Sequence, residues 1–176
     1  MQRFDWDLIG SVHPGDTMRR AKGFSLIELL IVVAIILIIA AIGVPSFLNS
    51  RIAANESAAV GALNALNTAQ ISYNTTYATV GFASNLTTLS GTCTGSVVPS
   101  ATSACLIDSV LESGTKSGYS FNLQGVSGAP ATSYQVIASP LNSITGVHSF
   151  CSFEDAVIRV SQTVITTCDS TVPEQQ

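Results

Sequence analysis

The sequence predicts an α+β protein in which a long N-terminal helix packs against a small antiparallel sheet of about four strands. Three observations support this fold class. An unbroken apolar run covers residues 29–44, a helical pattern with one apolar face follows over residues 52–77, and short alternating segments begin at Tyr119. The chain of 176 residues has room for this helix and one small globular region, but not for two.

The composition argues against several classes of function. Charged residues make up 10% of the chain, and the part after residue 23 holds three basic and eight acidic side chains, so a nucleic-acid partner is not expected. His13 precedes the apolar run, and His148 lies in a strand pattern without a nucleophile nearby. No glycine-rich phosphate loop and no metal-ligand spacing is present. We therefore expect no enzyme activity, no cofactor and no metal.

The basic residues Arg19, Arg20 and Lys22 directly precede the apolar run. The positive-inside rule then keeps this end in the cytoplasm and sends the C-terminal part across the membrane. An ordinary secretory signal peptide is the alternative, but the apolar run is longer than a signal-peptide core and no small-residue cleavage site with a separate mature start follows it. The sequence leaves open whether translation starts at Met1 or at Met18.

Glu28 is the one ionisable side chain in the apolar segment. In lipid only a helix satisfies its own backbone, and an acid facing hydrocarbon costs on the order of 2 to 3 kcal/mol. Glu28 therefore either stays near the membrane interface or has a charged partner. The spacing Ser25-x-x-Glu28 also fits a capping box, in which the acid closes the helix N-terminus.

These residues resemble the class III signal of the bacterial type IV pilin and type II secretion pseudopilin family. The resemblance covers residues 19 to about 50, and it joins the basic leader, Gly23, Phe24, the acid four residues later, the apolar helix and Pro45. It implies that a prepilin peptidase removes a leader, residues 1–23, by cutting between Gly23 and Phe24, and that it methylates the new amino group of Phe24.

The same resemblance implies how the apolar segment is used. It would anchor the mature chain in the inner membrane and later pack against copies of itself in a filament. Glu28 would then meet the N-terminal amine of Phe24 in a neighbouring subunit and set the axial register. Gly43 and Pro45 predict a helix kink or local melting, because proline lacks a backbone donor and clashes with the preceding turn.

Beyond Pro45 the helix becomes amphipathic and should continue to about Asn74, near 50 residues or roughly 75 Å in all. One face collects apolar side chains, and the other supplies a polar face. The apolar face is predicted to hold Ile52, Ala59, Leu63, Leu66, Tyr73 and Tyr77, and the polar face Arg51, Asn55, Glu56, Asn64 and Asn67.

The four cysteines all follow the apolar run, on the side that would be translocated, and an even count there predicts two disulfides. Three pairings can be written. The sequential pairing closes two short loops and is favoured. It joins Cys93 to Cys105 and Cys151 to Cys168.

Residues 75–117 are rich in loop signals, with a short helical turn expected over residues 107–111. Four strand-like alternations follow, separated by turn signals, and predict an antiparallel sheet with one face on the helix. They contain Tyr119, Phe121 and Leu123; Tyr134, Val136 and Ala138; His148, Phe150 and Ser152; and Ile158 and Val160.

The chain is thus expected to comprise a leader (1–23), a transmembrane and assembly helix (24–48), its amphipathic continuation (49–77) and a globular head (78–176). The predicted function is a structural subunit of a homo-oligomeric type IV pilus-like filament. Its expected partners are the prepilin peptidase, the assembly machinery and, before assembly, inner-membrane lipid, and its final location is the cell surface. A periplasmic pseudopilin of a type II secretion system is the alternative, followed by a membrane-anchored periplasmic binding module.

Overall fold

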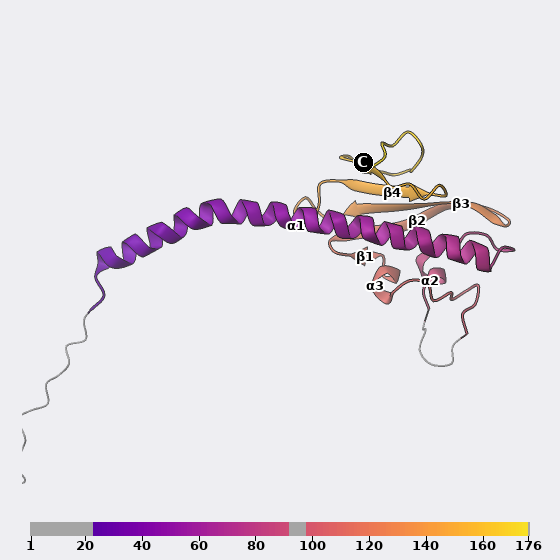
Figure 1. Cartoon of the computed structure of the whole chain (residues 1–176), viewed down its shortest axis with the longest axis horizontal. Coiled ribbons are helices and arrows are strands. Elements are labelled where there is room, and N and C mark those ends of the chain that lie inside the picture. The colour runs from indigo at the N-terminus through magenta and orange to yellow at the C-terminus, as the bar shows by residue number, and fades with distance from the viewer. Residues whose placement is uncertain (1–22, 92–97, 176) are drawn as a thin grey trace, which may run out of the picture. The chain divides into compact units, whose positions relative to one another are not determined.

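The computed structural model describes residues 23–91 and 98–175. The described residues form three helices and five strands (Figure 1). Contacts divide the chain into one unit up to Ala41 and a second from Ile42 onward. The elements are α1 (Leu26–Thr76), α2 (Leu86–Leu89), α3 (Ser109–Glu112), β1 (Thr115–Lys116), β2 (Tyr119–Gly128), β3 (Ala131–Pro140), β4 (Ser149–Phe153) and β5 (Arg159–Ser161).

The strands form one antiparallel sheet in the order β1-β2-β3-β4-β5, so each strand pairs with its neighbour in the sequence. The predicted α+β class, a long N-terminal helix with a small antiparallel sheet, is confirmed. The sheet has five strands rather than about four. The additional strand is β1, which pairs Thr115 with Ser120 and Lys116 with Tyr119. Two residues are too few to show the alternation that identifies a strand in a sequence.

One face of the sheet packs against the second half of α1. Tyr119, Tyr134 and Val136 lie on this face with no exposed area, and they meet Leu63 and Leu66 of α1, which are equally buried. The apolar helical period predicted from the sequence therefore corresponds to this contact. The helix residues buried here are Ala59, Ala62, Leu63, Leu66, Asn67, Ala69, Gln70 and Tyr73.

The opposite face of the sheet is covered by the C-terminal segment. Side chains alternate along a strand, so Ile137 of β3 points away from the face that carries Val136 and Ala138. Ile137 is opposite Cys151 of β4 in the strand register. Both belong to a second buried cluster, whose other members are Ile165 and Cys168. A layer of C-terminal chain thus shields a sheet face that a two-layer fold would leave in solvent.

Two buried amides on α1 fix polar contacts inside the core. Asn67, predicted to lie on the polar face of the helix, is instead 3% exposed. Its Nδ2 donates to Ser152 Oγ at 2.9 Å, and its Oδ1 accepts from the Tyr134 hydroxyl at 3.2 Å. Gln70 donates to the carbonyl of Ala83 at 3.1 Å and accepts from the Ala83 N–H at 2.8 Å.

The placement of Asn67 corrects the sequence prediction, and its cause is not local. A side-chain amide offers both donors and an acceptor, and here these satisfy groups that lie 67 and 85 residues further along the chain. Asn55 and Glu56, also assigned to the polar face, are partly buried by contacts with the segment before β4. Arg51 and Asn64 are exposed, as predicted.

α1 continues through Gly43 and Pro45 without interruption. The local melting predicted as one outcome at these residues is therefore absent, and the kink stays a prediction. Pro45 has no N–H to donate to the carbonyl four residues earlier, so one helical hydrogen bond is missing here. An apolar helix tolerates this loss as a point of weaker backbone bonding.

We expect Asn67→Ala to destabilise the head by about 1–3 kcal/mol, because the Tyr134 hydroxyl and Ser152 would lose their buried partner. Urea unfolding of the detergent-solubilised protein, followed by the near-ultraviolet circular dichroism of its tyrosines, measures the change. Asn64→Ala, an exposed amide on the same helix, is the matched control. Equal midpoints for the two variants would contradict the assigned role of Asn67.

Candidate functional site: the assembly helix and the disulfide-bonded loop

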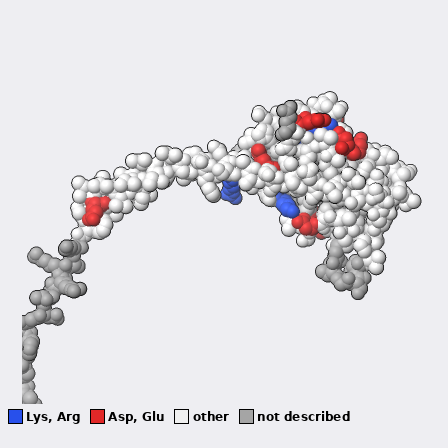
Figure 2. Space-filling view, viewed as in Figure 1, with Lys and Arg blue, Asp and Glu red and all other residues white. Residues whose placement is uncertain are grey.

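The N-terminal part of α1 has an apolar surface that is exposed along its whole length. Every residue from Gly23 to Arg51 is exposed, including Leu26 at 81% and Ile42 at 74%. In Figure 2 this segment is white apart from a red acidic group near its start and a blue basic group further along, and the sequence has Glu28 and Arg51 as its charged residues. By length and composition α1 can cross a membrane. An apolar surface this large marks a site of membrane or protein contact.

Glu28 lies at the beginning of the helix. The carbonyl of Ser25 accepts from the N–H of Glu28 at 3.1 Å and of Leu29 at 3.2 Å, so helical bonding begins at Ser25. Among residues 23–91 and 98–175, the Glu28 carboxylate has no hydrogen-bond or ion-pair partner, and neither bond of the capping box is formed. The carboxylate is therefore available to a group outside the described chain.

Gly23 and Phe24 precede the helix and are both exposed, Phe24 at 72%. An extended, accessible peptide bond is what a peptidase requires, and the backbone here is not in a helix. The leader itself lies outside the described residues, except for Gly23. Cleavage between Gly23 and Phe24 and methylation of Phe24 stay predictions.

Known proteins are similar to part of this chain. Residues 18–44 match the family described as the prokaryotic N-terminal methylation motif. The type IV wide pilus major component PilA4 of Thermus thermophilus is 55% identical over 47 residues, which are 27% of this chain and 36% of that protein. The type IV major pilin protein PilA of Myxococcus xanthus is 52% identical over 54 residues, 31% of this chain and 24% of that protein. The chain is thus similar to type IV pilins over less than a third of its length.

The family resemblance predicted from the sequence is thereby confirmed. The matched region spans about a third or less of the length of these pilins. No solved structure matches the chain. The family match covers residues 18–44 alone, so the rest of the chain is described from its own contacts.

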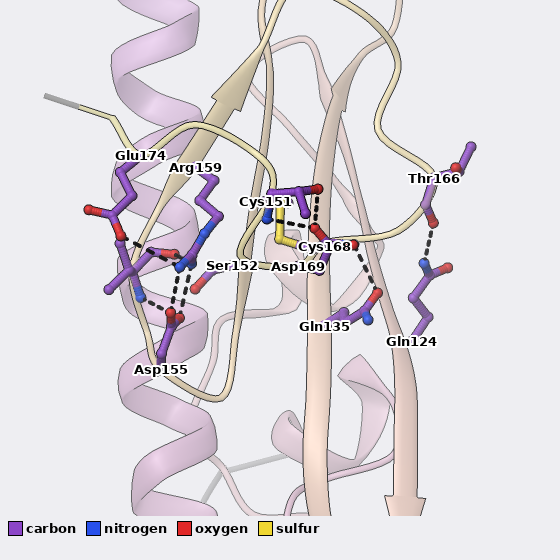
Figure 3. The surroundings of a disulfide bond; sticks show 12 residues. Gln124, Gln135, Cys151, Ser152, Asp155, Arg159, Thr166, Cys168, Asp169 and Glu174 are labelled. Atoms are coloured by element: carbon purple, nitrogen blue, oxygen red, sulfur yellow. Dashed lines mark hydrogen bonds and ion pairs between the residues drawn. A yellow bond between two sulfur atoms is a disulfide. The ribbon is translucent and has the colours of Figure 1, made fainter.

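A disulfide holds the C-terminal segment of the head on the sheet. It joins Cys151 of β4 to Cys168, with a Cα–Cα distance of 5.9 Å (Figure 3). This is the pairing that the sequence favours. Both cysteines are at most 2% exposed, so the bond belongs to the core cluster on the outer face of the sheet. Cys105 is also disulfide-bonded, but its predicted partner Cys93 lies outside the described residues.

Two glutamines of the sheet hold the same segment by its backbone. Gln135 of β3 accepts from the N–H of Cys168 at 3.1 Å, and Gln124 of β2 donates to the carbonyl of Thr166 at 2.7 Å (Figure 3). These contacts give a coil segment hydrogen-bond partners that it cannot find within itself. The loop between the last two cysteines is consequently attached to the sheet at more than one point.

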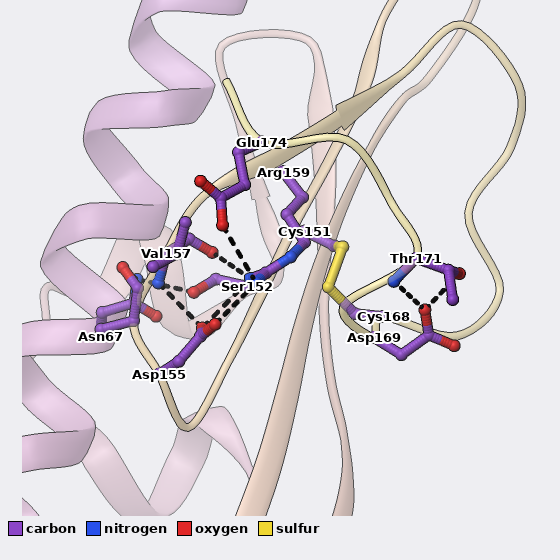
Figure 4. A network of polar contacts seen from close by, with 11 residues as sticks. Asn67, Cys151, Ser152, Asp155, Val157, Arg159, Cys168, Asp169, Thr171 and Glu174 are labelled. Carbon is purple, nitrogen blue, oxygen red and sulfur yellow. Dashed lines mark hydrogen bonds and ion pairs between the residues drawn. A yellow bond between two sulfur atoms is a disulfide. The ribbon is translucent and has the colours of Figure 1, made fainter. Parts of the chain in front are cut away.

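Arg159 of β5 is the centre of a buried polar network that sequence reasoning missed (Figure 4). Its side chain is 4% exposed and makes two bonds to the carboxylate of Asp155, at 2.7 and 3.1 Å. Its guanidinium also lies 4.2 Å from the ring centre of Phe153 and 3.6 Å from Glu174 Oε1. The sequence signal was the i,i+4 pair Asp155 and Arg159, which in a turn followed by a strand is not diagnostic.

Glu56 of α1 holds the segment that leads into β4. Its Oε1 accepts from the N–H of Val147 at 2.9 Å and of His148 at 3.1 Å, and it lies 3.0 Å from His148 Nδ1. Burial raises the pKa of the Glu56 carboxyl, but the hydrogen bonds from Val147 and His148 outweigh it, and the net pKa is below the usual 4.5. Among the described residues no cluster suited to a metal ion is found.

The pKa of Glu56 makes a part of the head's stability depend on pH. Because the pKa in the folded protein is lowered, the stabilisation is fully present above the unfolded pKa and is lost as pH falls through the folded pKa. We expect the unfolding free energies of the wild type and Glu56→Gln to differ most above about pH 5 and to converge below it.

Urea unfolding at a series of pH values measures this difference. Glu154→Gln, at an exposed carboxylate in the turn after β4, is the control for a generic loss of charge. A gap between wild type and Glu56→Gln that stayed constant on acidification would show that the ionised carboxylate is not what holds Val147 and His148.

Proposed function

We propose that the chain is a structural subunit of a type IV pilus-like filament, processed between Gly23 and Phe24 and assembled through its N-terminal helix. The observation that carries the proposal is the apolar surface of residues 24–48, exposed throughout and interrupted by one carboxylate. Such a surface is stable in lipid or against other helices, but not in water. Residues 18–44 match the N-terminal methylation motif, and the two pilus components named above are similar to part of this chain, which supports the same role.

In this proposal the subunit occupies two environments in succession. Residues 24–48 first span the inner membrane as a single pass with the N-terminus in the cytoplasm, and residues 49–176 lie on the far side. In the filament, neighbouring copies replace lipid around the same helix. Because both surroundings are apolar, the transfer keeps the helix surface out of water at every step. The prepilin peptidase and the assembly machinery are the partners this sequence of events requires.

We assign to Glu28 the role of setting the axial register between neighbouring subunits. A carboxylate without a partner in the described chain would carry a large desolvation cost inside a bundle of apolar helices. Processing would create a positively charged amine at Phe24, close to the start of the same helix. An intermolecular pair between the two removes both unpaired charges and fixes how far one helix is shifted along the next.

We expect Glu28→Ala to be processed and inserted into the membrane but to lower filament yield at least about tenfold. Removing one partner of a buried ion pair costs about 3–5 kcal/mol, because the remaining amine is left buried and unpaired. Immunoblots of membrane and sheared surface fractions measure processing, insertion and yield. Glu154→Ala removes an exposed acid of the head and is the matched control. Normal yield from Glu28→Ala would contradict the pairing.

Deletion of the gene tests the function itself. We expect electron microscopy to show the loss of surface filaments, and the wild-type gene to restore them. Intact filaments together with a loss of protein secretion would contradict the proposal and indicate a type II secretion pseudopilin. If filaments and secretion are both intact, a membrane-anchored binding module becomes the better account.

A further inference from the structure

The loop between β3 and β4, residues 141–148, presents apolar side chains to the outside. Leu141 is 57% exposed, Ile144 60% and Val147 53%. Residues 141–147 contain no charged side chain. Three large apolar groups in so short a loop form a surface that water solvates poorly.

This β3–β4 loop lies beside the turn of α1 that follows the apolar segment. Asn55 of α1 donates to the carbonyl of Thr145 at 2.9 Å, and Glu56 accepts from the N–H of Val147 at 2.9 Å. In Figure 1 the connection from β3 to β4 is found at the end of the sheet where α1 enters the head. Leu48, the last residue of the apolar segment, is seven residues before Asn55, or about 10 Å along the helix.

The loop is held in one conformation by its own polar groups. Asn142 Oδ1 accepts from the N–H of Ile144 at 3.0 Å and of Thr145 at 3.1 Å. The N–H of Leu141 donates to the carbonyl of Gly118 at 3.0 Å. Gly146 is buried and leaves the space that the Tyr119 hydroxyl occupies. With these backbone groups satisfied, the apolar side chains are the surface that the loop offers.

The depth of the helix in a bilayer sets how far this surface lies from the lipid interface. With Glu28 at the cytoplasmic interface, the 20 residues from Leu29 to Leu48 span about 30 Å, the thickness of the hydrocarbon core. The interfacial zone adds roughly 5 to 7 Å on each side, and the side chains of the β3–β4 loop reach several ångströms from their backbone. Asn55, which holds the loop, lies about 10 Å beyond Leu48 along the helix, so side chains that extend toward the bilayer, together with an ordinary tilt of about 20°, would place apolar groups of the loop at the headgroups.

We infer that the β3–β4 loop is a second membrane contact of the inserted subunit, with Leu141, Ile144 and Val147 in the interfacial region of the bilayer. The inference rests on the membrane-inserted stage of the proposed function. Arg51, exposed on α1 between Leu48 and the loop, adds a cation for lipid phosphates. Two attachments, one helix and one loop, restrict how the head tilts on the membrane before assembly.

An introduced tryptophan tests the contact. The full-length protein in a Trp6→Phe background, which removes the single native tryptophan, is reconstituted into phosphatidylcholine and phosphatidylglycerol vesicles that contain lipid brominated close to the headgroup. Val147→Trp places the fluorescent side chain in the β3–β4 loop. Val80→Trp is the matched control, because Val80 is 43% exposed but follows the far end of α1, about 30 Å along the helix from Glu56.

We expect bromine quenching at Val147→Trp to be at least about twofold stronger than at Val80→Trp, because an indole in the interface is in contact with the brominated chains. Adding Leu141→Ser and Ile144→Ser should lower the quenching at Val147→Trp toward the control. The substituted side chains are exposed, and unchanged near-ultraviolet circular dichroism verifies that the head is folded.

Three results would overturn the inference. If quenching is equal at the two positions and the protein resists alkaline extraction, the loop does not contact the membrane, although the helix still anchors the chain. A blue shift at Val147→Trp without bromine quenching, increasing with the protein-to-lipid ratio, assigns the loop to a second copy of the chain. Protein that is released by alkaline extraction contradicts both the anchor and the loop contact.

Discussion

The apolar surface of residues 24–48 is the constraint on which the other features depend. β-branched residues dominate this segment, and in water they favour strands, yet the segment is helical. In an apolar surrounding a helix satisfies every backbone group without a partner, so the environment and not the propensity selects the structure. The described part of the chain offers nothing to cover this surface. The helix therefore needs lipid or other helices, and the proposed filament of identical subunits would supply the second.

The second half of α1 packs against the sheet. Its buried side chains there are small or polar as well as apolar. Ala59, Ala62 and Ala69 are small buried side chains of the core, while Asn67 and Gln70 bond to particular groups of the head. An apolar helix face alone can slide along a sheet at little cost. Buried amides penalise such a shift, because each would lose its partners. They thus fix the position of the head along α1, and with it the distance from the head to Leu48.

The features predicted from the sequence are those encoded by local pattern. The apolar run, the helical period through Leu63 and Leu66 and the alternation in β2 and β3 each repeat over neighbouring residues, and each is present in the structure. The missed features depend on residues far apart in the chain. β1 is too short for a pattern, and the burial of Asn67 requires Tyr134 and Ser152. The C-terminal layer over the sheet is visible only once Cys151 and Ile137 share a face.

The β3–β4 loop and the N-terminal part of α1 both expose apolar side chains. The β3–β4 loop satisfies backbone amides with its own acceptors and leaves Leu141 and Ile144 exposed. In water these two exposed side chains contribute no hydrophobic stabilisation. The position of the loop is set by Glu56 and Asn55, whose bonds hold the loop against the helix without burying those side chains. Their outward placement, about 10 Å along the helix beyond Leu48, is the feature on which the proposed contact between the loop and the bilayer rests.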